Sequence, residues 1–183
     1  FFVLATQNPI EMEGTYPLPE AQLDRFMFNV LIDYLPEDDE VAVVQQTTSR
    51  NPESVTPLFE GDLVREFNQV VQRVPVADDV ARYAVRLASA SRPGTTASDY
   101  VNQYVSWGAG LRPAQYLVLG GKASALLDGR AYVSAADIRA LCEPVMRHRI
   151  LPNYRAEAEG VSTGQIIQHL METVDHPRQE AVA

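Results

Sequence analysis

Three residues of this sequence have a type and a setting suited to phosphate chemistry, and the first is Asn8. It follows an apolar run that predicts a buried strand over residues 1–6. In open α/β sheets, ligands bind beyond the carboxyl ends of strands. Because an amide both donates and accepts hydrogen bonds, Asn8 could orient a water molecule beside a phosphate. The alternative interpretation is a turn formed by Asn8 and Pro9.

The second residue is Arg25, which closes a short helix predicted over residues 20–24. A second apolar run follows and predicts a strand over residues 26–32. A guanidinium is always charged and matches phosphate oxygens in geometry. Projecting from a domain edge, Arg25 could stabilise transition-state charge on a phosphate held by a neighbouring subunit. The alternative is a surface salt bridge with Asp24 or Glu20.

Arg112 is the third residue, and it begins a helix predicted over residues 113–128. A helix N-terminus favours anions through its free N–H groups and its dipole. A cation at this position is therefore unfavourable unless an anion accompanies it. That anion could be a phosphate or an acidic side chain of the protein.

Other kinds of site find little support in the sequence. His148, His169 and His176 have no ligand-like spacing to one another or to Cys142, which disfavours zinc and predicts no metal site. Neither G-x-S-x-G nor G-x-x-x-x-G-K-[ST] occurs in the chain. The basic cluster at residues 147–149 is interpreted as a solvated helix end.

The elements that must position these residues change in character near Leu35 and Pro36. Residues 1–35 predict a small α/β piece with two strands and a short helix, and residues 36–183 predict a helical bundle. Ser134 with Asp137, and Ser162 with Gln165, have the spacing of capping boxes at helix starts. Apolar periodicity, acidic first turns and these caps predict helices over residues 37–47, 61–73, 77–90, 113–128, from 134 beyond 142, and 162–174.

Composition limits the function classes. The formal net charge of -9 and the pI of about 4.8 weigh against nucleic-acid binding. A single cysteine allows no intramolecular disulfide and favours a reducing compartment such as the cytoplasm. No apolar run is long enough for a membrane span, so no membrane partner is expected. The chain does not begin with Met, and we expect it to be part of a longer protein.

The complete set of motifs resembles the MoxR family of AAA+ ATPases. The resemblance rests on ATQNP at residues 5–9, GTYPLPEAQLDRF at residues 14–26, WGAGLR at residues 107–112, the segment from Val133 to Arg149, and NYRAEAEG at residues 153–160. It implies a mainly α chain: the C-terminal remnant of a P-loop AAA+ α/β core over residues 1–35, then a helical lid over residues 36–183. By resemblance, Asn8 is sensor 1, Arg25 is the arginine finger, and Arg112 is sensor 2.

The same resemblance implies a function for the longer protein. That protein would bind ATP and Mg²⁺ and couple hydrolysis to chaperone-like remodelling or maturation of protein complexes. Its partners would be neighbouring subunits of a ring, such as a hexamer, and a von Willebrand factor A-domain protein. The chain alone is expected to be inactive, because the Walker A and Walker B segments would precede Phe1. The alternative is a non-catalytic helical adaptor that docks a protein partner, and a third possibility, a DNA-binding helical module, is disfavoured by the net charge.

Overall fold

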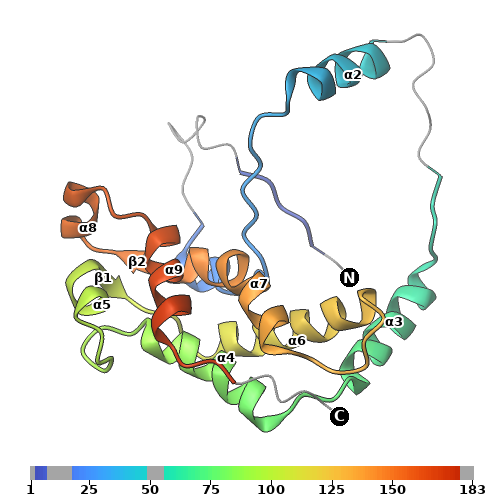
Figure 1. The fold of residues 1–183 in the computed structure, drawn as a ribbon. Coiled ribbons are helices and arrows are strands. Elements are labelled where there is room, and N and C mark those ends of the chain that lie inside the picture. Colours follow the sequence, from blue (N-terminus) through green and yellow to red (C-terminus); the bar gives the residue numbers. More distant parts are fainter. Residues whose placement is uncertain (1–2, 8–17, 49–55, 178–183) are drawn as a thin grey trace.

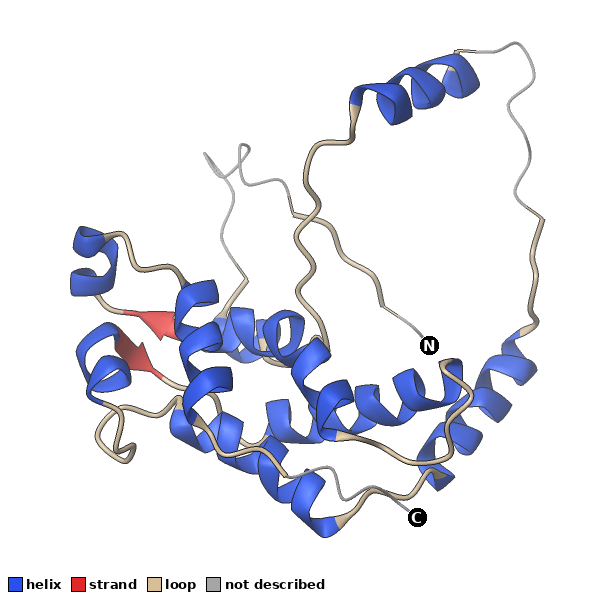
Figure 2. Ribbon diagram, viewed as in Figure 1, coloured by secondary structure: helices blue, strands red, loops and turns tan. Residues whose placement is uncertain are grey.

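The computed structural model describes residues 3–7, 18–48 and 56–177, and within these ranges the chain is mainly helical (Figures 1 and 2). The helices are α1 (Glu20–Leu23), α2 (Glu37–Thr47), α3 (Gly61–Arg73), α4 (Asp78–Ala90), α5 (Asp99–Tyr104), α6 (Arg112–Leu127), α7 (Ala135–Met146), η2 (Arg147–Arg149), α8 (Tyr154–Glu159) and α9 (Thr163–Thr173). The two short strands are β1 (Val105–Trp107) and β2 (Leu151–Pro152). The expected mainly α class, with a helical bundle as its larger part, is confirmed.

Helices α4, α6, α7 and α9 surround one apolar core, which lies in the helical bundle (residues 74–174). Its largest fully buried side chains include Tyr83, Leu87, Leu117, Ile138, Ile166 and Leu170. These residues recur at helical spacing along their segments, so each helix presents one apolar face inward. Helix α6 approaches α7 closely at Gly121, where a Cβ would lie 3.3 Å from Ile138 Cδ1.

The helix starts predicted from side-chain caps are confirmed. Ser134 accepts from the backbone N–H of Asp137, and the Asp137 carboxylate accepts from the N–H of Ser134. Ser162 and Gln165 exchange the same pair of hydrogen bonds at the start of α9. Each box satisfies N–H groups that have no partner within the helix.

A small antiparallel sheet, which the sequence pattern did not predict, joins β1 to β2. Ser106 Oγ donates to the carbonyl of Leu151 at 2.9 Å, and Asn153 N–H donates to the carbonyl of Tyr104 at 2.9 Å. The pairing holds the turn after Trp107 beside η2. This turn connects β1 to Arg112, the first residue of α6.

The strands predicted over residues 1–6 and 26–32 are absent from the described part of the chain. Residues 3–7 and 26–32 carry no strand assignment, and Ile32 is 89% exposed. A strand is defined by hydrogen bonds to a partner strand, and no described segment pairs with either run. The short helix predicted before Arg25 is confirmed as α1.

Helix α2 stands apart from the bundle in Figure 1 and buries no side chain. Its four acidic residues occupy the first turn, as expected, where they face the positive end of the helix dipole. Helix α3 packs beside α6, and Lys122 Nζ donates to the carbonyl of Gln72 at 3.0 Å. The division of the chain at residue 35 stays a prediction.

Candidate functional site

Asp24 joins the N-terminal segment (residues 18–35) to the helical bundle. It immediately follows α1 and lies between two arginines of the bundle. Arg112 Nη1 donates to Asp24 Oδ2, and Arg149 Nε donates to Asp24 Oδ1 at 2.7 Å. Burial alone would raise the pKa of the Asp24 carboxyl, but the hydrogen bonds from Arg149 and Arg112 outweigh it and lower the pKa. Asp24 is therefore a carboxylate at neutral pH.

Arg149 is the most buried cation of this junction, with a side chain that is 2% exposed. Its Nη2 donates to the carbonyls of Asp24 at 2.6 Å and Phe26 at 2.5 Å, and its Nη1 donates to that of Val145. The guanidinium also lies over the Tyr116 ring, 5.2 Å from its centroid. A buried charge is tolerated only when it is paired and hydrogen-bonded, and these contacts meet that condition.

The neighbouring carbonyls of the N-terminal segment are held by other groups of the bundle. Tyr116 Oη donates to the carbonyl of Arg25 at 3.0 Å, and His148 Nε2 donates to that of Phe26 at 3.1 Å. Arg147 Nη1 donates to the carbonyl of Asn29 at 3.1 Å. These three carbonyls are therefore hydrogen-bonded by side chains of the bundle.

The interpretation of residues 147–149 as a solvated helix end is wrong. Arg149 is buried, and all three side chains contact the N-terminal segment. Burial, reinforced by the nearby Arg149 charge, lowers the pKa of His148 to about 4. His148 is consequently neutral at pH 7, and its buried Nδ1 has no hydrogen-bond partner within the described residues.

The structure bears differently on the predictions made for the three site residues. Asn8 lies outside the described residues. The Arg25 side chain is exposed and, within the described residues, takes part in no ion pair, so the alternative salt bridge with Asp24 or Glu20 does not form. Arg112 pairs with an acid, as its alternative interpretation proposed. The roles of all three toward a nucleotide stay predictions.

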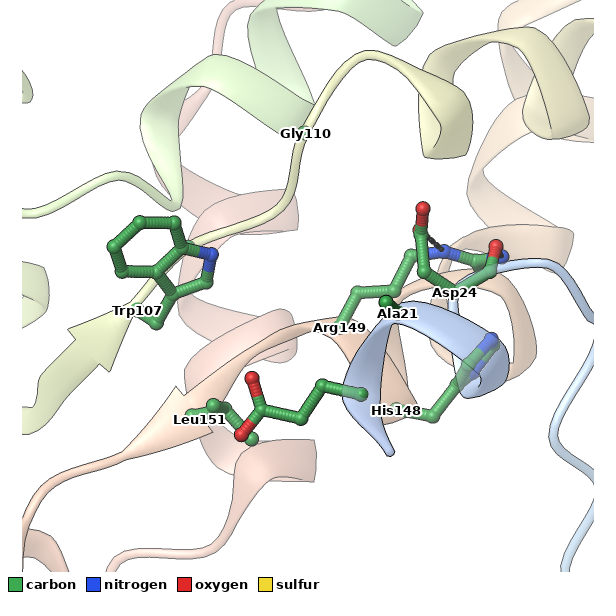
Figure 3. A pocket seen from close by; sticks show the side chains of 9 residues that line it. Ala21, Asp24, Trp107, Gly110, His148, Arg149 and Leu151 are labelled. Carbon is green, nitrogen blue, oxygen red and sulfur yellow. Dashed lines mark hydrogen bonds and ion pairs between the residues drawn. The ribbon is translucent and has the colours of Figure 1, made fainter. Parts of the chain in front are cut away.

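A cavity of about 280 Å³ opens beside this junction. Figure 3 shows Asp24 and Arg149 facing each other on one side, with Trp107 on the other. The remaining lining residues are Glu20, Ala21, Gly108, Gly110, His148 and Leu151. The cavity therefore lies between α1, the turn after β1, and the end of η2.

The residues present fit a phosphate group in one respect. Arg112 stands at the first position of α6 and already holds a planar oxyanion, the Asp24 carboxylate. A guanidinium in that setting is equally suited to phosphate oxygens. Within the described residues, no group of three or more His, Cys, Asp or Glu side chains could hold a metal ion.

Asp24 and Arg149 are the site residues that the sequence reasoning missed. Asp24 was considered only as a surface partner for Arg25. The available signal was the acid directly before Arg25, together with an arginine cluster directly after a long apolar helix. Their pairing spans 125 positions in the sequence, which periodicity does not register.

Comparison with known proteins places both parts of the chain. A model described as "ATPase family associated with various cellular activities (AAA)" matches residues 1–28, and one described as "AAA lid domain" matches residues 97–170. A crystal structure of a "putative ATPase" from Cytophaga hutchinsonii has a TM-score of 0.90 and 37% identity, and the match covers 97% of this chain and 55% of that one. The chain is therefore the end of an AAA ATPase core joined to an AAA lid domain.

The curated relatives narrow this class. Chaperone MoxR1 of Mycobacterium tuberculosis is 34% identical over 183 residues, covering 100% of this chain and 48% of the relative. The "uncharacterized protein YeaC" of Bacillus subtilis is 34% identical over 182 residues, covering 99% and 54%. Protein MoxR of Paracoccus denitrificans is 29% identical over 173 residues, covering 87% and 51%. The chain belongs to the MoxR family of AAA ATPases and represents its C-terminal region, spanning about half the length of these relatives.

None of the helices in the described ranges is both long and apolar enough to cross a bilayer.

Proposed function

We propose that this chain is the nucleotide-responsive part of a ring ATPase that couples ATP hydrolysis to chaperone-like remodelling or maturation of protein complexes. One observation carries the proposal: Arg112, which begins a helix of the bundle, pairs with Asp24, the residue directly before the exposed Arg25. Both arginines thus stand at the junction of the core end and the lid. A relative named as a chaperone, MoxR1, supports the cellular role.

The residues would divide the work between two subunits. Asn8 would orient the attacking water in the subunit's own site, and Arg112 would contact nucleotide phosphate. Arg25, which is exposed, would reach the nucleotide of the neighbouring subunit and stabilise charge in the transition state. When bound, ATP would supply the phosphoryl group, and Mg²⁺ would neutralise charge on its oxygens.

The partners follow from the same scheme. Neighbouring subunits of a ring, such as a hexamer, would each complete the site of the next, and a von Willebrand factor A-domain protein would link the ring to its client. The protein would work in the cytoplasm, without a nucleic-acid or membrane partner. Head-to-tail interfaces of this kind close into rings when the rotation permits.

The 183-residue chain alone should neither bind ATP tightly nor hydrolyse it. It contains no G-x-x-x-x-G-K-[ST] segment to cradle the phosphates. Release of phosphate from ATP by the purified chain, above a heat-denatured blank, would show this expectation to be wrong.

The central test uses Arg25→Ala in the full-length protein. Turnover should fall on the order of 10³-fold or more, which is the usual effect of losing an arginine finger. Binding of a non-hydrolysable ATP analogue should change little, because Arg25 acts across an interface. Arg82→Ala is the matched control, since Arg82 pairs on the surface with Asp78 and turnover should be unchanged.

An equal loss of binding and turnover would contradict the finger assignment. If neither Arg25→Ala nor Arg112→Ala alters turnover, the adaptor alternative takes its place.

A further inference from the structure

The Arg112–Asp24 ion pair differs from the Arg149–Asp24 ion pair in its access to solvent. The Arg112 and Asp24 side chains are 42% and 33% exposed, whereas that of Arg149 is 2% exposed. A ligand can therefore reach Arg112 without opening the bundle, while Arg149 is sealed among its acceptors.

Arg112 needs an anion at its position. It is the first residue of α6, a helix of 16 residues, where the dipole opposes a positive charge. Within the described residues, Asp24 is the acid that pairs with it. If Arg112 leaves Asp24, it requires a replacement, and a nucleotide phosphate carries more charge than a carboxylate.

Asp24, in contrast, keeps a charged partner when Arg112 leaves, because Arg149 also pairs with it. Its Oδ1 and its backbone carbonyl both accept from Arg149, at 2.7 Å and 2.6 Å. The next carbonyl, that of Arg25, accepts from Tyr116 at 3.0 Å. Departure of Arg112 would leave Asp24 paired and the backbone around Arg25 held in place.

We propose that Asp24 is a positioning residue that competes with nucleotide phosphate for Arg112, holding it without nucleotide and releasing it when phosphate binds. The inference rests on the proposed function of Arg112. Arg149 is the fixed partner that keeps Asp24 ionised and in place in both states. Asp24 thereby sets the affinity of the site for nucleotide without contacting the nucleotide.

The test measures the affinity of the full-length protein for a non-hydrolysable ATP analogue after Asp24→Asn. The amide oxygen can still accept from Arg149, but the charge that competes for Arg112 is gone. The dissociation constant should fall by about two- to five-fold, the range expected for a partly exposed ion pair. The same substitution in an Arg112→Ala background should have no effect, because the competition no longer exists.

Two further variants complete the design. Asp78→Asn removes an exposed acid paired with Arg82 and should leave the affinity unchanged. Asp24→Ser also removes the counter-charge of the buried Arg149, which keeps its hydrogen bonds to the carbonyls of residues 24, 26 and 145, and it should tighten binding as Asp24→Asn does. Amide hydrogen exchange over residues 20–29 checks that the segment stays in place in both variants. Thermal unfolding of each variant checks that the bundle is intact.

Unchanged or weaker binding in both Asp24 variants, or the same gain with and without Arg112, would overturn the inference and leave the proposed function standing. If Arg112→Ala by itself leaves the affinity for the analogue unchanged, the phosphate role of Arg112 fails and the inference falls with it.

Discussion

The helical bundle and the N-terminal segment are stabilised in different ways. The bundle has a continuous apolar core, in which Leu117, Ile138 and Leu170 are fully buried. The N-terminal segment buries no comparable side chain and is held by hydrogen bonds from Arg149, Tyr116 and His148 to its backbone carbonyls. The segment also packs Met27 and Phe28 against α6 at Gly120, but these side chains are not fully buried. The chemistry proposed for Arg25 is thus placed on the part of the chain whose position the bundle controls.

The largest expected difference between the two regions is in the free energy of unfolding when one leucine of each region is replaced by alanine. In the 183-residue chain, Leu170→Ala should lower the free energy of unfolding by about 2–5 kcal/mol, because it empties part of a close-packed core. Leu31→Ala, at a side chain that is 70% exposed, should change it by less than ~0.5 kcal/mol. Urea unfolding followed by circular dichroism measures both, and equal losses would show that the two regions share one core.

Arg149→Met should separate the two regions without unfolding the bundle. The variant keeps an unbranched apolar chain in place of the Arg stem but removes the donors to Asp24, Phe26 and Val145, and hydrogen bonds to charged groups contribute about 1.5–3 kcal/mol each. Amide hydrogen exchange over residues 20–29 should accelerate by about tenfold or more, while α9 keeps its protection. Arg82→Met, at an exposed ion pair, is the control. Faster exchange throughout α9 would mean that Arg149 supports the bundle itself.

A smaller effect should appear in the pH dependence of stability. The folded pKa of His148, about 4, lies below the ordinary value of 6.5. Between these values the unfolded chain binds more protons, so this contribution is complete above about pH 6.5 and is lost as pH falls towards 4. After allowance for partial exposure, it amounts to about 1 kcal/mol between pH 7 and pH 5.

His148→Asn should flatten the unfolding free energy over that pH range, whereas His176→Asn, at an exposed position, should leave its slope unchanged. If both variants keep the slope of the unaltered chain, His148 is not the group responsible.

The sequence predicted the features that depend on neighbouring residues and did not predict those that depend on residues remote in the chain. Helices α2, α3, α4 and α6 and both capping boxes follow from local periodicity and caps, which need only neighbouring residues. The strands expected over residues 1–6 and 26–32 are not formed within the described residues, because a strand needs a partner and apolar content does not supply one. The β1–β2 pairing was missed for the corresponding reason, since Val105 and Pro152 are remote in sequence.

The candidate site was predicted in part. Arg112 was recognised from its place at a helix start, and the structure places it beside the residue next to Arg25. Asp24 and Arg149 were not recognised, because their significance comes from tertiary pairing rather than from any local pattern. Asn8 lies outside the described residues, so its role rests on the resemblance alone.

One measurement tests the division of labour between Arg25 and Asn8 most directly. Full-length Arg25→Ala and Asn8→Ala subunits, each expected to have little turnover alone, are mixed and assayed for ATP turnover. Where an Asn8→Ala subunit offers its intact Arg25 to the site of an Arg25→Ala subunit, whose Asn8 is intact, a complete site forms, and random mixing places this at about one interface in four. We predict recovery of turnover on mixing. No recovery at any mixing ratio, with assembly intact, would contradict action of Arg25 across the interface.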